Sequence, residues 1–262
     1  MISNPILAHL ALVGALLALP AVAAPAMAES YYARGALGYD TTLDTRFRDR
    51  DCRNQAPPAL FGCQTGSDGR AIGSRGDFGS GISHELAAGY RHSPWLRIEL
   101  AATQQTGFDF DGEANFLGVS ESQPARGRVR SSQAMVLGLV DLPTPALPFS
   151  LQPFVGAGLG WSRNSTGTFR YHFPGLGENA STLVRGGSSH EFAWQLRAGL
   201  AAPLTPRLAA ELVLVYSDLG KVETGRGDAT IRRPSGDRSL AIDATEATLR
   251  SRAVRLGLRY SF

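Results

Sequence analysis

The alternation of apolar and polar residues is clearest in the last fourteen positions of the chain, residues 249–262 (LRSRAVRLGLRYSF). Val254, Leu256, Leu258 and Tyr260 fall on one face of an extended strand, because successive side chains of a strand point in opposite directions. The other face is basic or small. In a soluble sandwich the apolar face would meet a second sheet. In a transmembrane barrel it would meet lipid, and the arginines would point into a polar interior.

A similar alternation recurs along the chain and predicts eight strands. Their expected positions are residues 31–40, 81–91, 95–110, 129–142, 151–169, 188–202, 207–219 and 249–262. In the fifth strand Gly156, Gly158 and Gly160 share one face, which would leave room for bulky interior side chains from neighbouring strands. The fourth strand is apolar at nearly every position from 135 to 142, so alternation does not assign its two faces.

The connections between these strands are sorted by length. Long polar segments, at about 41–80, 111–127, 170–187 and 220–246, alternate with short turns that contain Pro94, Pro143 to Pro148, and Pro203 to Pro206. Outer-membrane barrels have long external loops and short periplasmic turns, whereas a soluble sandwich has no reason to sort its loops in this way. The pattern therefore predicts an all-β fold, an eight-stranded antiparallel up-and-down transmembrane β-barrel with four long external loops and three short periplasmic turns.

Residues 1–28 are expected to form a signal peptide. An apolar run from Pro5 to Val22 precedes the small residues AMA at 26–28, although the segment before the run lacks the usual Lys or Arg. An N-terminal membrane helix is the alternative. Residues 29–262 would then form a single barrel domain. No later stretch approaches the roughly 18 consecutive apolar residues of a membrane helix, so a mature chain that spans a membrane must cross it as strands.

Composition narrows the classes of function. The formal net charge is +3, and the 26 basic residues, of which only Lys221 is a lysine, are spread along the chain. A nucleic-acid binder would concentrate them in a patch, so no nucleic-acid partner is expected. Cys52 and Cys63 are the only cysteines, and in an exported chain they are predicted to form a disulfide in the first external loop. No histidine lies near them, and no metal or cofactor is predicted.

Several segments resemble the small outer-membrane β-barrel family of Gram-negative bacteria. They are FAWQLRAGLAAPLTPRLAAEL (192–212), VYSDLGKVETG (215–225), RLGLRYSF (255–262), PFVGAGLGWS (153–162) and VDLP (140–143). Members of this family include Opa-like adhesins and barrels similar to the OmpA transmembrane domain. The resemblance implies an eight-stranded barrel in the cell outer membrane, inserted by an assembly machinery that reads a C-terminal aromatic signal, here Phe262, Tyr260 and Leu258. We expect the barrel to be a monomer. It implies no single activity, because members differ in their loops.

The inward positions of the predicted barrel collect many charges. We expect a lumen charge network of Arg34, Glu85, Arg91, Arg97, Glu99, Arg197, Glu211, Arg255 and Arg259, and Glu191 also falls on an inward position. An eight-stranded barrel is just wide enough for side chains to fill its interior, and an isolated buried charge is very costly. The charges are therefore predicted to pair and to plug the barrel, and a narrow ion-selective pore is the alternative.

Two copies of one tripeptide, Arg75-Gly76-Asp77 and Arg226-Gly227-Asp228, lie in predicted external loops. A guanidinium and a carboxylate on either side of a flexible glycine can be bound by some host adhesion receptors, so these residues are candidate adhesion motifs.

A lipid-modifying enzyme would need a nucleophile, a base and an acid, and Ser188, Ser189, His190 and Glu191 supply these residue types. His190 and Glu191, however, point to opposite faces of their strand, so Glu191 is not expected to orient the imidazole.

The expected function is a structural or adhesin-like surface-interaction role carried by the external loops, without enzyme activity. A small porin or ion channel is the first alternative, and a lipid-modifying enzyme is the second. The expected partners are the assembly machinery, outer-membrane lipid and lipopolysaccharide, whose phosphates suit the arginine side chains, and a host or cell-surface ligand for the loops.

Overall fold

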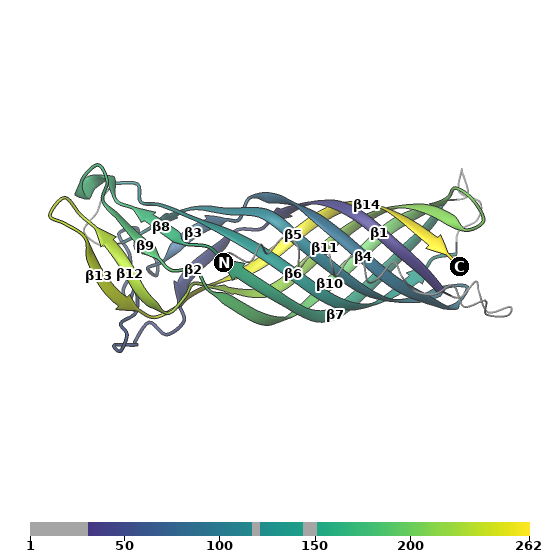
Figure 1. Ribbon diagram of the computed structural model, residues 1–262, viewed down its shortest axis with the longest axis horizontal. Helices are drawn as coiled ribbons and strands as arrows, with labels where there is room; N and C mark the ends of the chain where they lie inside the picture. The colour runs from purple at the N-terminus through teal and green to yellow at the C-terminus, as the bar shows by residue number, and fades with distance from the viewer. Residues whose placement is uncertain (1–30, 117–120, 144–150) are drawn as a thin grey trace, which may run out of the picture.

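The computed structural model describes residues 31–116, 121–143 and 151–262, and its eight long strands close into one antiparallel barrel (Figure 1). The strands of the ring are, in order, β1 (Tyr31–Thr42), β4 (Ser80–Ser93), β5 (Leu96–Ala114), β6 (Pro124–Asp141), β7 (Gln152–Thr166), β10 (Ser188–Pro203), β11 (Leu208–Glu223) and β14 (Thr245–Ser261). Each pairs with the next, and β1 pairs with β14 from Tyr32 opposite Ser261 to Thr42 opposite Ser251. The predicted eight-stranded up-and-down barrel is confirmed.

Two sequence predictions concern residues outside the ranges that the structure describes. The predicted signal peptide, residues 1–28, lies outside the described residues, and so does most of the turn predicted between Pro143 and Pro148. Within the described residues, no helix is long and apolar enough to cross a membrane.

Alternation assigns the two faces of the strands correctly. In β14, Arg255 and Arg259 are buried inside the barrel, while Val254, Leu256 and Leu258 are exposed on its outer wall. For β6, whose faces the sequence left open, Met135, Leu137 and Leu139 point inward, and Val136 points outward. The exposed apolar positions of all eight strands together form a continuous band around the barrel, as expected of a lipid-facing surface.

Aromatic rings mark both edges of this band. At the strand ends that adjoin the short turns lie Tyr31, Tyr90, Trp95, Tyr260 and Phe262, with ring centroids 5.1 Å apart for Tyr31 and Tyr90 and 5.5 Å apart for Tyr260 and Phe262. Toward the opposite edge lie Tyr39, Trp161, Phe192, Trp194 and Tyr216. Rings at these positions form the two aromatic girdles at the membrane–water interfaces.

The glycines of β7 make room for large residues of β6, as predicted. Gly156, Gly158 and Gly160 point inward, where a Cβ on Gly158 would lie 2.8 Å from the backbone oxygen of Val136. The side chain of Leu137 lies over that glycine, and those of Leu139 and Met135 lie over the other two. These three apolar residues thus pack across the wall of the barrel interior.

The external segments are folded into further strands beyond the apolar band, at the end of the barrel opposite the C-terminus (Figure 1). These elements are β2 (Thr45–Asp49), β3 (Ser74–Asp77), β8 (Phe169–His172), the 3-10 turn η2 (Pro174–Leu176), β9 (Ser181–Val184), β12 (Gly227–Arg232) and β13 (Arg238–Ile242). The β5–β6 hairpin also continues until Glu113 pairs with Pro124, so both ends of the predicted polar segment 111–127 are strand. We refer to all of these external elements, with the outer ends of the long strands, as the cap.

Candidate functional site

The part of the barrel interior nearest the short turns is built around Arg97. Its guanidinium donates to Asp141 with an Nη2–Oδ1 distance of 2.7 Å and to Glu211 with an Nη1–Oε1 distance of 3.4 Å. It also lies 4.8 Å from the ring centroid of Phe154, within the range of a cation–π interaction. Arg259 donates to the same oxygen of Glu211 at 2.7 Å. All four charged groups are buried, so the pairing compensates for their lost hydration.

Glu85 is the carboxylate with the most partners at mid-height of the interior. It accepts from Arg34 at 2.6 Å, from both terminal nitrogens of Arg197 at 2.7 and 2.9 Å, and from Arg255. The hydroxyl of Thr103 donates to it at 2.8 Å. Three guanidinium groups from β1, β10 and β14 therefore converge on one carboxylate from β4.

Arg34 links these two layers into one network. Besides Glu85, it donates to Glu99 at 2.8 Å and lies 3.6 Å from Glu211, and Tyr32 donates to Glu99 at 2.9 Å. Among the described residues, the buried barrel interior contains five cations and five anions, so their formal charges cancel. They are Arg34, Arg97, Arg197, Arg255 and Arg259, and Asp40, Glu85, Glu99, Asp141 and Glu211.

A chain of amide side chains crosses the interior next to this network. Arg197 donates to Gln195 at 2.8 Å, Gln195 donates to Gln133 at 2.6 Å, and Gln133 donates to Gln105 at 2.7 Å. Gln105 in turn donates to Asp40. Because these residues come from β10, β6, β5 and β1, their hydrogen bonds join opposite walls of the barrel.

Eight of the nine residues of the predicted charge network lie buried in this interior. The ninth, Arg91, lies at the rim near the short turns, where it donates to Asp141 at 3.0 Å and to the backbone oxygen of Pro94 at 3.2 Å. The network predicted from the sequence omitted Asp40 and Asp141, although alternation places each of them on the same face as the inward residues of its own strand. Glu191 also faces inward but makes no ion pair in the part of the chain that the structure describes; its side chain lies against Gly220.

An aromatic cluster fills the cap beyond the polar interior. Phe47, Phe78, Phe110 and Phe169 are fully buried, with ring centroids 4.6 to 5.9 Å apart. They come from β2, the β3–β4 connection, β5 and β8, so the cluster joins three external segments. Edge-to-face pairs of this kind stabilise packing beyond simple burial. The cap is therefore packed around an apolar core that is continuous with the apolar residues of the barrel interior.

The predicted disulfide between Cys52 and Cys63 is present, with a Cα–Cα distance of 4.9 Å. The segment that it closes is held by Asp49, whose carboxylate accepts from the backbone N–H groups of residues 60–62 at 2.7 to 3.2 Å. Burial raises the pKa of Asp49, and these hydrogen bonds offset part of that effect because they favour the charged form.

Asp243 attaches the disulfide segment to the last external segment. Its carboxylate accepts from Asn54 Nδ2 at 2.6 Å, and its backbone N–H donates to the oxygen of Pro58 at 2.9 Å. The hydrogen bond from Asn54, with the nearby charges of Arg50 and Arg226, lowers the pKa of Asp243. Segments almost two hundred residues apart in the sequence are thus joined in the cap.

The two candidate adhesion motifs have different surroundings. Arg75-Gly76-Asp77 lies in β3, which pairs with β2 on one side and with β5 on the other, and a Cβ on Gly76 would collide with the backbone of Asp111. The flexible presentation expected for this copy is therefore wrong. In Arg226-Gly227-Asp228 the last two residues belong to β12 and pair with β13, with Gly227 at a φ of 128°. The arginine and aspartate of this copy are exposed, and the arginine donates to the backbone oxygen of Ala56 at 3.1 Å.

The residues considered for a lipid-modifying enzyme are not brought together. Ser188 and His190 lie on the outer wall of β10, whereas Ser189 and Glu191 face inward. Ser189 donates its hydroxyl hydrogen to the backbone oxygen of Lys221 at 2.6 Å. Among the hydrogen bonds of the described residues, none links His190 to a serine or to Glu191.

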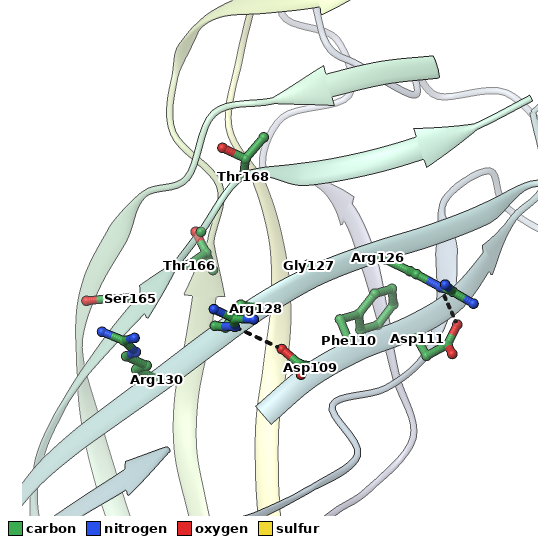
Figure 2. Close-up of a pocket in the computed structure, with 11 residues that line it drawn as sticks. Asp109, Phe110, Asp111, Arg126, Gly127, Arg128, Arg130, Ser165, Thr166 and Thr168 are labelled. Atoms are coloured by element: carbon green, nitrogen blue, oxygen red, sulfur yellow. Dashed lines mark hydrogen bonds and ion pairs between the residues drawn. The ribbon is translucent and has the colours of Figure 1, made fainter. Parts of the chain in front are cut away.

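A groove on the outer wall of the barrel brings together residues that the sequence interpretation did not single out. Figure 2 shows Arg126, Arg128 and Arg130 along β6, with Ser165 and Thr168 of the β7–β8 junction across from them. The volume of the groove is about 920 Å³. A second hollow of about 620 Å³ shares Arg128 and Arg130 and adds Arg163 of β7. The signal in the sequence was the run RGRVR at 126–130, which places three arginines on one face of a strand.

Two carboxylates of β5 compete for some of these arginines. Arg128 lies 3.2 Å from Asp109, and Arg126 lies 3.6 Å from Asp111, with all four side chains at least two-thirds exposed (Figure 2). Within the described residues, neither Arg130 nor Arg163 makes an ion pair. Across the groove and the adjoining hollow, four arginines therefore face two aspartates. We refer to Arg128, Arg130 and Arg163 as the arginine cluster.

An apolar band between two aromatic girdles, wrapped around a packed and charged interior, defines a transmembrane β-barrel of the bacterial outer membrane. Residues 14–262 match the family described as outer membrane protein beta-barrel domain, and the chain belongs to this family. The protein is accordingly a component of the cell outer membrane, in contact with its lipids.

Two solved structures have a similar fold at low sequence identity. The outer membrane protein OprG of Pseudomonas aeruginosa is 15% identical, with 90% of this chain and 97% of that chain covered and a TM-score of 0.50. The outer membrane protease OmpT of Escherichia coli is 10% identical, with the same coverage and a TM-score of 0.50. At this identity the likeness concerns the fold alone. No curated protein gives a significant match to the chain.

Proposed function

We propose that the protein is a closed barrel that serves as a surface-interaction protein through its cap and does not conduct ions. The interior supports the closed state because side chains fill it at three successive levels. These levels are the ion pairs around Arg97 and Glu85, the amide chain from Arg197 to Asp40, and the aromatic cluster around Phe47. A small porin would require these hydrogen-bonded groups to separate.

The observation that carries the interaction role is the free edge of β13. This strand is the last of the sheet and pairs only with β12, so its outer backbone N–H and C=O groups have no strand partner among the described residues. Four of its five residues are exposed, including Leu240. An edge strand of this kind can accept an extended peptide as an additional strand, which gives affinity through backbone hydrogen bonds. The ligand class is therefore an extended protein segment on a host or neighbouring cell surface.

A binding assay with matched variants tests this role. Cells that display the full-length protein would be added to immobilised extracellular-matrix and cell-surface proteins. We expect Leu240→Asp to abolish binding, because it places a charge where an added strand would pack. Leu176→Asp, at a similarly exposed leucine on η2, should leave binding unchanged. Equal binding by wild type and Leu240→Asp would contradict the edge-strand mechanism, and loss of binding with Asp228→Glu instead would favour the tripeptide.

The alternatives have tests of their own. In planar bilayers we expect no steady unitary conductance from the purified protein, and a stable open level would favour the small porin. Release of acyl chains from lipopolysaccharide that disappears with His190→Ala would support the lipid-modifying enzyme instead.

A further inference from the structure

We infer that the arginine cluster on the outer wall binds a phosphate group of a lipid in the outer leaflet. The inference concerns the wall of the barrel rather than the edge strand of the cap, so it goes beyond the proposed function and does not depend on it.

The height of the cluster matches the headgroup layer. Trp161 belongs to the outer girdle, and Arg163 is the next residue of β7 that faces outward. Arg130 of β6 pairs with Ser165, which lies two residues beyond Arg163 along β7, further from the membrane. Each step of two residues is about 6.6 Å along a strand, or about 5 Å along the barrel axis at a tilt of about 40°. Arg163 and Arg130 therefore lie within about 10 Å of the girdle, beyond the apolar band.

The chemistry of the cluster suits a phosphate dianion. A guanidinium presents a planar fork of N–H donors that matches two phosphate oxygens, and such charge-assisted hydrogen bonds are strong. Arg130 and Arg163 make no ion pair within the described residues, so both are available. Arg128 is paired with Asp109, but both side chains are two-thirds exposed, and ion pairs this exposed are weak. A dianion can therefore displace Asp109 from Arg128.

The position of the groove favours a lipid over a soluble anion. The groove opens sideways on the wall of β5, β6 and β7, and the exposed rings of Trp161 and Phe192 lie on the membrane side of Arg163. A lipid whose phosphate is bound there would extend its acyl chains down the apolar wall past Trp161, which is 70% exposed. A soluble anion would gain nothing from that adjoining surface. We therefore assign the groove to the phosphorylated headgroup of a lipid with several acyl chains.

The test compares two lipids that differ only in phosphate. Full-length protein in detergent micelles would be titrated with bisphosphorylated lipid A and with lipid A from which both phosphates have been removed, and bound lipid would be counted by native mass spectrometry. Inorganic pyrophosphate and a sulfated polysaccharide serve as soluble probes. The variants are Arg130→Gln, Arg163→Gln and Asp109→Asn. The control is Arg252→Gln, which removes an exposed arginine from β14, three strands away from β7 in the ring.

We expect wild type to bind the bisphosphorylated lipid about tenfold more tightly than the dephosphorylated one, and Arg130→Gln and Arg163→Gln each to lose about three- to tenfold of this affinity. Asp109→Asn should bind more tightly, because a competing carboxylate is removed, and Arg252→Gln should behave as wild type. Equal affinity for the two lipids, or an equal loss with Arg252→Gln, would overturn the inference. Binding of either soluble probe as tightly as the lipid, with loss in the same variants, would overturn the lipid assignment.

Discussion

Replacing Glu85 by glutamine isolates the contribution of charge balance inside the barrel. The substitution keeps the size of the side chain and one acceptor oxygen but removes the negative charge on which Arg34, Arg197 and Arg255 converge. Five buried guanidinium groups would then face four carboxylates. Removing one partner of a buried ion pair costs about 3–5 kcal/mol, because the remaining charge is left uncompensated. With three arginines affected, we expect the free energy of unfolding to fall by about 4 kcal/mol.

Urea unfolding of the protein in phospholipid vesicles, followed by tryptophan fluorescence, measures this change. The gel shift between heated and unheated samples provides an independent measure of the folded fraction. Asp111→Asn is the matched control, because it removes a carboxylate whose ion pair with Arg126 is exposed on the outer wall, and it should leave stability unchanged. In a second variant, Glu85→Gln combined with Arg255→Met restores the balance at four charges of each sign, and we expect it to recover part of the lost stability.

The reasoning would be refuted if Glu85→Gln cost less than about 1 kcal/mol, which is the range of exposed pairs. It would also be refuted if Asp111→Asn cost as much as Glu85→Gln, since burial would then not be the cause.

Three other perturbations probe the disulfide segment, the packing across β6 and β7, and the cap. Cys63→Ser should leave the gel shift intact but speed tryptic cleavage at Arg53, because a loop of this length restricts the unfolded chain by about 3 kcal/mol; unchanged cleavage would contradict this. Gly158→Ala should lower the free energy of unfolding measured in urea, while Gly138→Ala should not, because there is open space around Gly138. Equal effects would show that the neighbouring interior side chains can move to accept the added methyl group. The lowered pKa of Asp243 adds stability above its unfolded pKa that is lost as pH falls through the folded value. Corrected amide-exchange protection at Asp243 should therefore fall as the pH drops below about 4, which is near the unfolded pKa of an aspartate, and Asp243→Asn should abolish this pH dependence.

The alternation of side chains was enough to predict the barrel because lipid and interior impose opposite demands on the two faces of a strand. In β14 the pattern is strict, so the inward Arg255 and Arg259 could be assigned from the chain alone. In β6 the alternation is not strict, since Met135 and Leu137 are apolar residues on an inward face. Their position follows from the glycines of β7, which leave space that only a large neighbour fills.

The external segments could not be predicted with the same success. Their strands are four to six residues long, too short for a clear period, and residues such as Phe47 and Phe169 are buried by partners from other segments. The outer-wall groove was missed for a related reason. Arg128 and Arg163 belong to different strands, and their proximity depends on the register between β6 and β7.

Sequence periodicity defined which residues of each long strand face lipid and which face inward, because that choice depends on one residue and its immediate neighbours along the chain. The partners of the inward charges are a different matter. Glu85 accepts a hydrogen bond from Arg255, 170 positions away, and Asp40 ends the amide chain. Both contacts depend on how the ring of strands closes and on the stagger between its strands. Ion pairing needs two groups within a few ångströms, and only the closed barrel sets those distances.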